Sequence, residues 1–503
     1  MFMKNIKHRL FLAIPLSLIC SFSCSDLAED DRGILLKETF LETELDLDAA
    51  VTNTYSKFLD NPWGGIAGRD IFAPLMGSDD IMTKANVSGW TVFDRFSVDP
   101  LNGTLQNLWA QFYSTIYAAN YVIENYHRVV SDNETKINQR VGEVRFLRAF
   151  SYFWLVRIHG ELPMPTTELD LAIKRSSIET VYEQIVSDLQ FAESHLPDSW
   201  GGEYGRPSKW SAKSLLSLVY LTMAGWPVKD ASKYALAAAK AEEVMDQGPY
   251  ILLPDFGDLW LMENDYNAEV VWGLVFCPLN TCGTEARTSI TARTTGPSEE
   301  DGWDQIYCEL GFFNKFPEGP RKDATYHTVF TDGTTWQESS VKHPFIAKYR
   351  DGSVEGEANY ESKDLTGRNM NFIRYAEVML IYAEATAMAS GPDAKAYDAV
   401  NQIKRRGQGL PLDVPAPGVD LTPGLSALAF RDEVIEERGW EFVAEFSRWF
   451  DLVRTEKVGE MNNNKPSDDL APLGTITEED YLLPIPSKER QLNPNLSQNP
   501  GYD

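Results

Sequence analysis

The chain has few of the residues that supply nucleophilic or metal-binding chemistry. Its 503 residues include five cysteines and six histidines, and none of them lies in a CxxC, HExxH or triad-like sequence. In an oxidising compartment Cys277 and Cys282 could close a small loop, although the odd number of cysteines beyond the N-terminal region, which includes Cys308, leaves one unpaired. The sequence therefore gives no support for metal or nucleophilic chemistry and predicts no cofactor and no metal-binding residue, while a structural metal ion stays open.

Positive charge and long apolar runs are also scarce. Lys and Arg number 46 against 74 Asp and Glu, which gives a formal net charge of -28. Such an excess of acid repels phosphate backbones, so we expect no nucleic-acid partner. Beyond the N-terminal region no apolar run is long enough to cross a bilayer. With 12% aromatic residues, however, the chain can bury a large core.

The N-terminus has the features of a secretory signal peptide. Three basic residues precede an apolar stretch, Leu10–Ile19, and small residues lead to Cys24. This stretch is too short for a stable spanning helix, so residues 1–23 are predicted to be removed. Removal takes away three positive charges, so the formal net charge changes from -28 to -31.

Cys24 resembles the acylated cysteine at a lipoprotein signal-peptidase site. We expect it to be lipidated and followed by a linker over residues 24–40. The alternative is ordinary cleavage that leaves Cys24 as a free thiol. The acidic run SDLAEDD that follows resembles an export signal to the outer face of the outer membrane in some Gram-negative bacteria. The predicted location is thus the outer membrane, facing the cell exterior, with contact to the membrane through the lipid anchor alone.

Helical periodicity dominates two parts of the remaining chain, residues 41–250 and 375–503. The predicted helices cover residues 46–60, 105–130, 139–160, 177–196, 211–224, 231–247, 375–390 and 394–407. Short breaks between them favour antiparallel pairs like those of tetratricopeptide arrays, although the WxxLGxxY pattern is not readable. We therefore predict a mostly α fold with a tetratricopeptide-like scaffold and an extended, proline-rich C-terminal tail.

Between these helical parts, residues 251–374 have a different composition. They contain a probable strand, AEVVWGLVF, and then a long region rich in glycine, threonine, proline and aromatic residues. A loop-rich segment of this size in a compact protein is usually functional. We therefore predict a partly β, loop-rich insertion that forms the ligand-binding region.

The segment Arg431–Arg454 is predicted to be one buried helix. Its large apolar residues recur at helical spacing on most sides, and several acidic and basic residues lie three or four positions apart. We interpret it as a core helix whose buried charges are paired. The alternative, a pair of glycosidase carboxylates, is disfavoured because two Glu one helical turn apart point the same way from one surface, whereas glycoside hydrolysis needs carboxylates that face each other.

Five longer motifs, in one order, resemble those of the SusD/RagB family of surface lipoproteins. They are RFLRAFSYFWLVRIHGELPM, FIRYAEVMLIYAEA, VNQIKRRG, ERGWEFVAEFSRWFDLVR and the tail LLPIPSKERQLNPNLSQNPGY. The resemblance implies a mostly helical body, a loop-rich ligand-binding portion and no catalysis. It also implies a partner, a TonB-dependent outer-membrane barrel of the SusC-like type, over which the lipoprotein acts as a lid that captures oligosaccharides or other nutrients. These motifs are mainly scaffold, so the resemblance does not give the substrate.

A site for sugars needs flat aromatic rings beside planar hydrogen-bonding groups, because sugar rings have apolar faces and hydroxylated edges. Two loop regions and their flanks combine such residues. The predicted ligand-binding residues are Trp63, Asp79, Asp80, Trp90, Tyr266, Arg287, Arg293, Trp303 and Trp336. We expect Trp90 and Trp303 to meet as a shallow aromatic surface, whereas tryptophans on helical faces are expected in the core, namely Trp109, Trp154, Trp210, Trp440 and Trp449.

The sequence leaves several functions open. The first is a non-enzymatic binder of oligosaccharides that hands its ligand to a transporter. The alternatives are a surface enzyme that degrades glycans, a binder of peptides, and a tetratricopeptide-type scaffold for proteins alone. A scaffold would explain the helices but not the aromatic loops.

Overall fold

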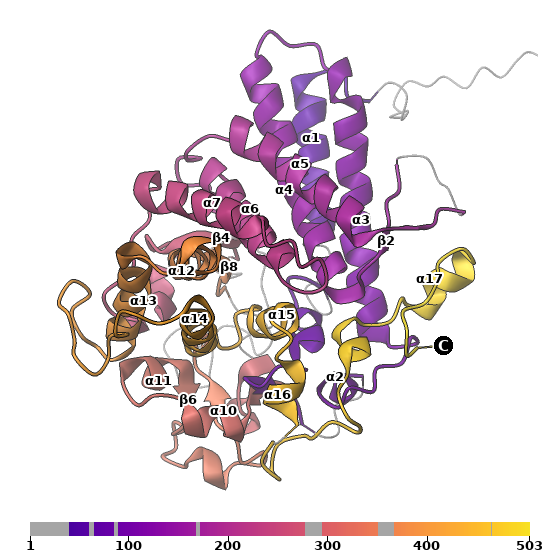
Figure 1. Cartoon of the computed structure of the whole chain (residues 1–503). Helices are drawn as coiled ribbons and strands as arrows, with labels where there is room; N and C mark the ends of the chain where they lie inside the picture. The colour runs from indigo at the N-terminus through magenta and orange to yellow at the C-terminus, as the bar shows by residue number, and fades with distance from the viewer. Residues whose placement is uncertain are drawn as a thin grey trace, which may run out of the picture. The chain divides into compact units, whose positions relative to one another are not determined.

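Antiparallel helices build the N-terminal half of the body (Figure 1). The computed structural model describes residues 40–59, 65–84, 89–166, 172–276, 294–350, 367–463 and 465–502. The long helices of this half are α1 (Glu44–Phe58), α3 (Gly103–Asn125), α4 (Glu134–His159), α5 (Ile178–His195), α6 (Lys209–Ala224) and α7 (Lys233–Gln247). Consecutive helices from α3 to α7 pack on one another. The predicted tetratricopeptide-like pairs, and with them the mostly α fold class, are confirmed.

Local sequence explains where these helices begin and end. Asn133 caps α4 by accepting a hydrogen bond from the backbone N–H of Lys136, and Thr43 forms a capping box at the start of α1. Gly160 ends α4 with a φ of 73°, a conformation that residues with a Cβ rarely adopt. Because α4 is buried on most sides, it forms the centre of this half.

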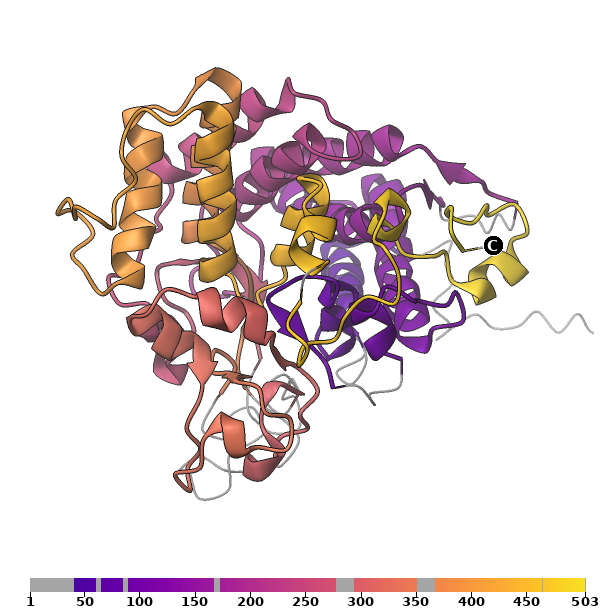
Figure 2. The same cartoon turned by 60° about the horizontal axis from the view of Figure 1, so that its bottom comes forward.

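The C-terminal helices close the same core. They are α12 (Tyr375–Ser390), α13 (Ala394–Gly407), α14 (Ala427–Glu441), α15 (Arg448–Arg454), α16 (Val458–Asn462) and α17 (Ser487–Leu492). Helix α12 packs against α7 from the first half and against its neighbours α13 and α14 (Figure 2). Residues 41–503 consequently form one compact unit. Within the described residues no helix is both long and apolar enough to traverse a lipid bilayer.

Short elements make up the segment between α7 and α12 and also occur in the loops near α3, between α4 and α5, and in the C-terminal tail. The short helices are α2 (Thr91–Asp94), α10 (Leu310–Lys315) and α11 (Pro320–Thr325), and the 3₁₀ turns are η1 (Asp70–Leu75), η2 (Tyr126–Arg128), η3 (Gly257–Trp260), η4 (Met262–Asn264), η6 (Ser298–Glu300), η7 (Trp336–Glu338) and η8 (Glu478–Tyr481). Within the described residues, four antiparallel ladders of two strands pair β1 (Ile81–Met82) with β5 (Tyr307–Cys308), β2 (Leu162–Pro163) with β3 (Arg175–Ser176), β4 (Val270–Leu274) with β8 (Met370–Arg374), and β6 (Tyr326–His327) with β7 (Phe345–Ile346). The predicted strand AEVVWGLVF is β4.

The β4–β8 ladder joins the two ends of the loop-rich segment. Val270 lies opposite Arg374 and Gly273 opposite Asn371, with irregular register between these pairs. A Cβ on Gly273 would lie 2.4 Å from the backbone oxygen of Met370, so this close approach requires glycine.

The structure corrects the prediction of one helix over Arg431–Arg454. Helix α14 ends at Glu441 and α15 begins at Arg448. Between them Ala444 and Phe446 have φ values of 59° and 69°, in the left-handed region that an α-helix cannot include. Asp80 accepts a hydrogen bond of 3.0 Å from the backbone N–H of Ala444, so a side chain from a distant loop stabilises the break.

Buried charges around this break are paired, as the sequence predicted. The carboxylate of Glu441 accepts hydrogen bonds from Arg406 at 2.6 Å, Arg374 at 2.9 Å and Arg321 at 3.1 Å. Burial by itself would raise the pKa of Glu441, but these three guanidinium groups lower it to about 2. Arg374 also pairs with Glu269 at 2.6 Å. The predicted core tryptophans Trp109, Trp154, Trp210, Trp440 and Trp449 are all buried.

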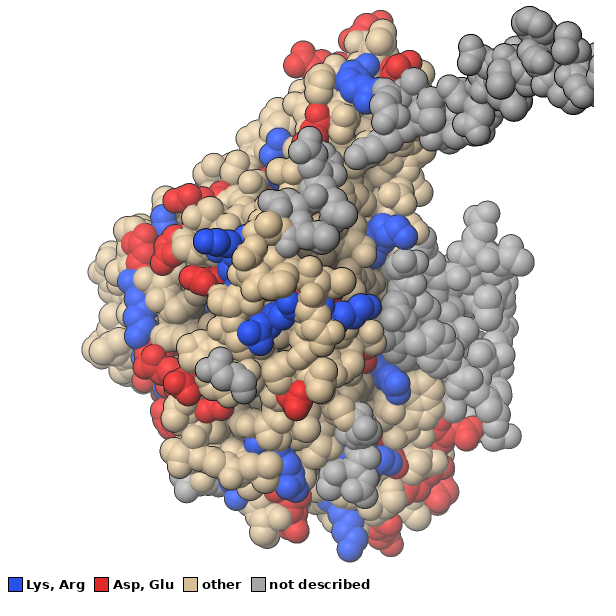
Figure 3. All heavy atoms as spheres, turned by 90° about the vertical axis from the view of Figure 1, so that its right-hand side faces the viewer, with Lys and Arg blue, Asp and Glu red and all other residues tan. Residues whose placement is uncertain are grey.

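The C-terminal tail packs on the end of α4. Asn499 donates to the backbone oxygens of His159 and Leu483 at 2.9 and 2.7 Å, and the backbone N–H of Leu483 donates to Ile158. On the side of the molecule that includes this tail, Lys and Arg are interspersed with Asp and Glu over the described surface (Figure 3). The acidic excess of the sequence is therefore not gathered into one patch on the visible part of this face.

Candidate functional site

The two loop regions that were predicted to form the site do meet. Strand β1 pairs with β5, so that Met82 lies opposite Tyr307, and Lys84 forms an ion pair of 3.2 Å with Asp304. Trp303 is partly exposed just before β5. Three predicted site residues, Trp63, Arg287 and Arg293, lie outside the described residues, as do Cys24, Cys277 and Cys282. Ligand binding by Trp63, Arg287 and Arg293 and lipidation of Cys24 stay predictions, and a disulfide between Cys277 and Cys282 stays open.

Trp90 does not form an exposed platform, which corrects the expectation from its glycine-rich context. Its side chain is 3% exposed. The indole N–H donates to Thr104 at 3.2 Å, and the guanidinium of Arg69 lies 5.7 Å from the ring centre. The surrounding loops fold back on α3, so glycine near Trp90 did not indicate exposure.

Asp79 and Asp80 have structural partners. Asp79 forms a two-point ion pair with Arg448 at 2.6 and 2.8 Å. Burial opposes the charge of Asp79, but Arg448 lowers the pKa of this carboxyl below its usual value. Burial raises the pKa of Asp80, which accepts from Ser78 and from the break after α14. Trp336, another predicted residue in the insertion, is partly buried, with its ring 5.9 Å from that of Phe313.

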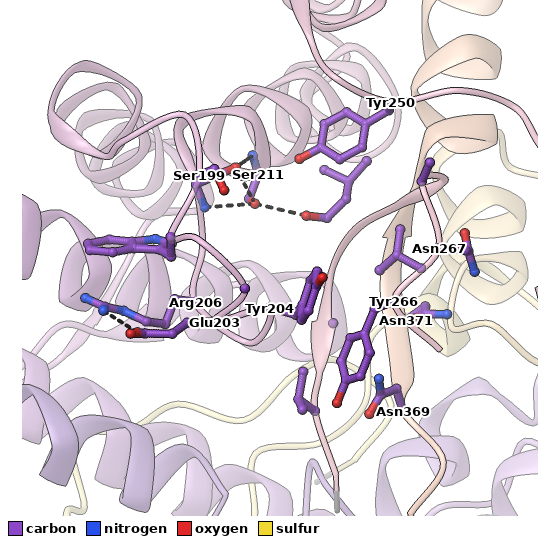
Figure 4. Close-up of a pocket in the computed structure, with 18 of the residues that line it drawn as sticks. Ser199, Glu203, Tyr204, Arg206, Ser211, Tyr250, Tyr266, Asn267, Asn369 and Asn371 are labelled. Carbon is purple, nitrogen blue, oxygen red and sulfur yellow. Dashed lines mark hydrogen bonds and ion pairs between the residues drawn. The ribbon is translucent and has the colours of Figure 1, made fainter. Parts of the chain in front are cut away.

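Tyr266, in contrast, lines a cavity that the sequence did not identify as a site (Figure 4). The cavity has a volume of about 240 Å³. It lies between the loop that connects α5 to α6, the turn before β4, and strands β4 and β8. Its lining includes Trp200, Glu203, Tyr204, Arg206, Tyr250, Tyr266, Asn267, Asn369 and Asn371.

Two stacked tyrosine rings are the most exposed aromatic feature of this cavity. The centres of Tyr204 and Tyr266 are 4.3 Å apart and their planes differ by 22°. Tyr204 is 57% exposed and Tyr266 47%. Exposed aromatic faces of this size are well suited to stack on an apolar ligand face.

Amide side chains lie beside the tyrosine pair (Figure 4). Asn369 accepts from the backbone N–H of Phe276 at 2.9 Å, and Asn267 accepts from that of Glu269 at 2.9 Å. Asn371, on β8, has no side-chain hydrogen bond with any residue that the structure describes. Because an amide both donates and accepts, Asn371 can bond a hydroxyl in either sense.

Ion pairs hold the two tyrosines in place from opposite sides. Arg206, two residues after Tyr204, donates to Glu143 of α4 at 2.8 and 2.6 Å. On the other side Asp265, next to Tyr266, accepts from Arg368 at 3.0 Å. Each tyrosine therefore lies in a segment that an ion pair fixes to the rest of the protein.

The acidic residues that line this cavity are all paired. Asp198 forms an ion pair with Lys209, Glu203 with Arg206, and Asp265 with Arg368. A general acid and base for glycoside hydrolysis would instead be two carboxyl groups aimed at a shared space. The described residues also contain no group of three His, Cys, Asp or Glu arranged for a metal ion, and burial raises the pKa of the free thiol of Cys308. The arrangement of side chains around the cavity is suited to binding a ligand.

Sequence reasoning missed both Tyr204 and Asn371, and only Tyr204 has a local signal. Tyr204 lies in SWGGEYGRP, which was read as a short break between helices. The signal that could have found it is the one applied to Trp90, a large ring among glycines. The same stretch contains Trp200, whose ring lies 3.4 Å from the guanidinium carbon of Arg206.

Comparison with known proteins identifies related sequences and structures over most of the chain. A family model described as the SusD family matches residues 305–502, and one described as starch-binding and associating with the outer membrane matches residues 37–221. SusD-like protein P2 of Formosa agariphila is 29% identical, with 98% of this chain and 99% of that protein covered.

Solved structures agree with this relationship. A SusD homologue from Bacteroides thetaiotaomicron superposes with a TM-score of 0.79 and 26% identity, covering 93% of this chain and 98% of that one. A laminarin-binding SusD-like protein gives a TM-score of 0.72 and 25% identity, covering 92% of this chain and 100% of that one. On these sequence and structural matches, together with its five ordered motifs, the chain belongs to the SusD/RagB family.

Proposed function

We propose that this chain is a surface protein that binds oligosaccharides or polysaccharide nutrients without cleaving them. The observation that supports this most directly is the pair of half-exposed, stacked rings of Tyr204 and Tyr266 beside the amide of Asn371. Aromatic faces stack on the C–H faces of sugar rings, and amides bond the hydroxyls at their edges. The cavity combines both kinds of group.

The relatives support a glucan as the first ligand to test. One neighbouring structure is described as laminarin-binding, and the family model over residues 37–221 as starch-binding. These two glucans differ in linkage, so both belong in a binding panel. The pairing of Asp198, Glu203 and Asp265 with basic residues supports binding over hydrolysis.

The location and partner form a further part of the proposal. Cys24 would anchor the mature protein in the outer membrane, and the family model's association with that membrane supports this location. The ligand would pass to a TonB-dependent barrel, over which the protein acts as a lid. In this scheme residues 41–250 and 375–503 form the scaffold, whose α5–α6 loop contributes Tyr204 to the site, and residues 251–374 form the ligand-binding insertion, which contributes Tyr266.

The central test is a double substitution, Tyr204→Ala with Tyr266→Ala. Loss of each ring should weaken binding by about tenfold or more, since burying a large apolar side chain contributes about 1.5–3 kcal/mol. Isothermal titration against laminarin and starch oligosaccharides measures the affinity, and a reducing-end assay on the same mixtures detects any cleavage. Tyr117→Ala is the matched control because Tyr117 is 41% exposed on α3, outside the cavity.

The possible results of these assays distinguish a glycan-binding protein from an enzyme and from a peptide-binding protein. Lost glycan binding in the double variant, with Tyr117→Ala unchanged and no new reducing ends, supports the proposal. Release of reducing ends by the purified protein would favour the enzyme instead. Binding of a tryptic peptide mixture but of none of the glycans would favour a peptide ligand. Co-purification of the tagged protein with an outer-membrane barrel tests the partner separately.

A further inference from the structure

A second cavity adjoins the one that contains the tyrosine pair. It has a volume of about 410 Å³ and lies against α1, α4 and β4, within the size range of roughly 300–1,000 Å³ typical of small-molecule pockets. Five residues line both cavities, namely Glu203, Arg206, Gly273, Leu274 and Val275. A ligand held at the tyrosine pair would therefore have this second space next to it, past Arg206 and the end of β4.

The walls of this second cavity are mainly apolar. Aliphatic and aromatic side chains from three elements contribute to them, including Val51, Phe58, Leu147, Trp272 and Leu274. These residues are buried in the body. They present carbon to the space, which favours an apolar occupant.

The polar groups at the cavity are already bonded to one another. Glu143 accepts from Tyr55 at 2.8 Å and from Arg206 at 2.8 and 2.6 Å. Arg140 donates to Asp48 at 2.5 Å and to Glu143 at 3.3 Å. Few hydrogen-bonding groups are therefore left for a ligand, in contrast to the amides of the first cavity.

This contrast decides which part of a ligand suits the second cavity. A sugar unit rich in hydroxyls would lose its hydrogen bonds to water there and regain few, at a cost for each unpaired hydroxyl. An acyl or aryl group loses no such bonds and gains contact with apolar walls. Resting on the proposed function, we propose that the protein recognises oligosaccharides that have an apolar substituent, with the sugar at the tyrosine pair and the substituent in the second cavity.

The test compares matched ligands that differ only in the substituent. Each oligosaccharide of the glucan panel is titrated as its methyl glycoside and as its phenyl glycoside. The wild-type protein should bind the phenyl form about tenfold more tightly, because a phenyl ring buries much more apolar surface than a methyl group.

A substitution at the mouth of the second cavity shows where the preference arises. Thr52 is an exposed residue of α1 that lines this cavity, so Thr52→Trp would fill the entrance without altering the core. It should remove the preference for the phenyl form while leaving the affinity for the methyl form unchanged. Asn53→Trp is the matched control, since Asn53 is the exposed neighbour outside the lining, and it should preserve the preference.

The results distinguish this inference from the proposed function. Equal affinity of the wild type for both forms, or a preference that survives in Thr52→Trp, would overturn the substituent site while leaving glycan binding intact. Two results together would support both the proposed function and the substituent site. They are loss of binding of the methyl glycoside in Tyr204→Ala and loss of the preference for the phenyl glycoside in Thr52→Trp. If neither form of any oligosaccharide binds, both proposals are wrong.

Discussion

Replacing Glu441 with Gln tests whether the buried charges around the end of α14 stabilise the fold. The substitution keeps the size of the side chain but removes its charge. Arg406, Arg374 and Arg321 then lose the carboxylate that they share. Each keeps another acidic partner, for example Glu269 for Arg374 and Arg406, so the region retains part of its pairing.

The size of the effect follows from the pKa of Glu441. Although burial raises it, the three guanidinium groups lower it from 4.5 to about 2. At 1.36 kcal/mol per unit, this difference corresponds to about 3 kcal/mol of folding free energy. Independently of the pKa, removing one partner of a buried ion pair lowers the free energy of unfolding by about 3–5 kcal/mol. We therefore expect Glu441→Gln to lower the free energy of unfolding by about 3 kcal/mol at pH 7.

Urea denaturation followed by tryptophan fluorescence measures this change. Glu436→Gln is the matched control, because Glu436 is an exposed residue of the same helix. The pH dependence gives a second readout. Since the folded-state pKa of Glu441 is lowered, its contribution is fully present above about pH 4.5 and is lost as the pH falls toward 2. The difference between wild type and variant should narrow over that range. A loss no larger than that of Glu436→Gln at pH 7 would refute the reasoning.

Two further predictions concern the proposed lipid anchor, Cys24, and the buried Trp90. Cys24→Ala should release the protein from membranes into soluble fractions, because several acyl chains on one residue give stable attachment; surface-exposed, membrane-bound protein in cell fractionation would show that Cys24 is not the anchor. Trp90→Ala should cost about 3–5 kcal/mol of stability, since its ring is 3% exposed, while the glycan affinity of the folded protein stays close to that of wild type. A melting curve paired with titration measures both, and lost affinity at unchanged stability would return Trp90 to the site.

Helices could be predicted from the sequence because periodicity and caps are local signals. The stretch that became α4 has an apolar pattern on most sides, an Asn cap and a terminal Gly160. The break between α14 and α15 has no such signal. Ala444 and Phe446 occupy the left-handed region without being glycine, and the partners that stabilise the break, including Asp80, come from elsewhere in the sequence.

The candidate site was harder to predict because exposure depends on tertiary packing. Trp90 and Tyr204 are both large rings near glycines, yet Trp90 is 3% exposed and Tyr204 57%. What separates them is the neighbouring structure, since α3 and its adjoining loops cover Trp90, whereas Arg206 holds the Tyr204 loop on α4. Tyr266 was predicted from its place before a strand, but the sequence could not show that its ring stacks on that of Tyr204.

The order of charges along the chain has a consequence for folding. Glu441 comes later in the sequence than Arg321, Arg374 and Arg406, the three cations that it neutralises. A chain that ended before this residue would have to bury those cations with one carboxylate fewer, at a cost of several kcal/mol. This region is therefore less stable until the segment with Glu441 has joined it. Chains truncated before Glu441 should accordingly be less stable than the full chain.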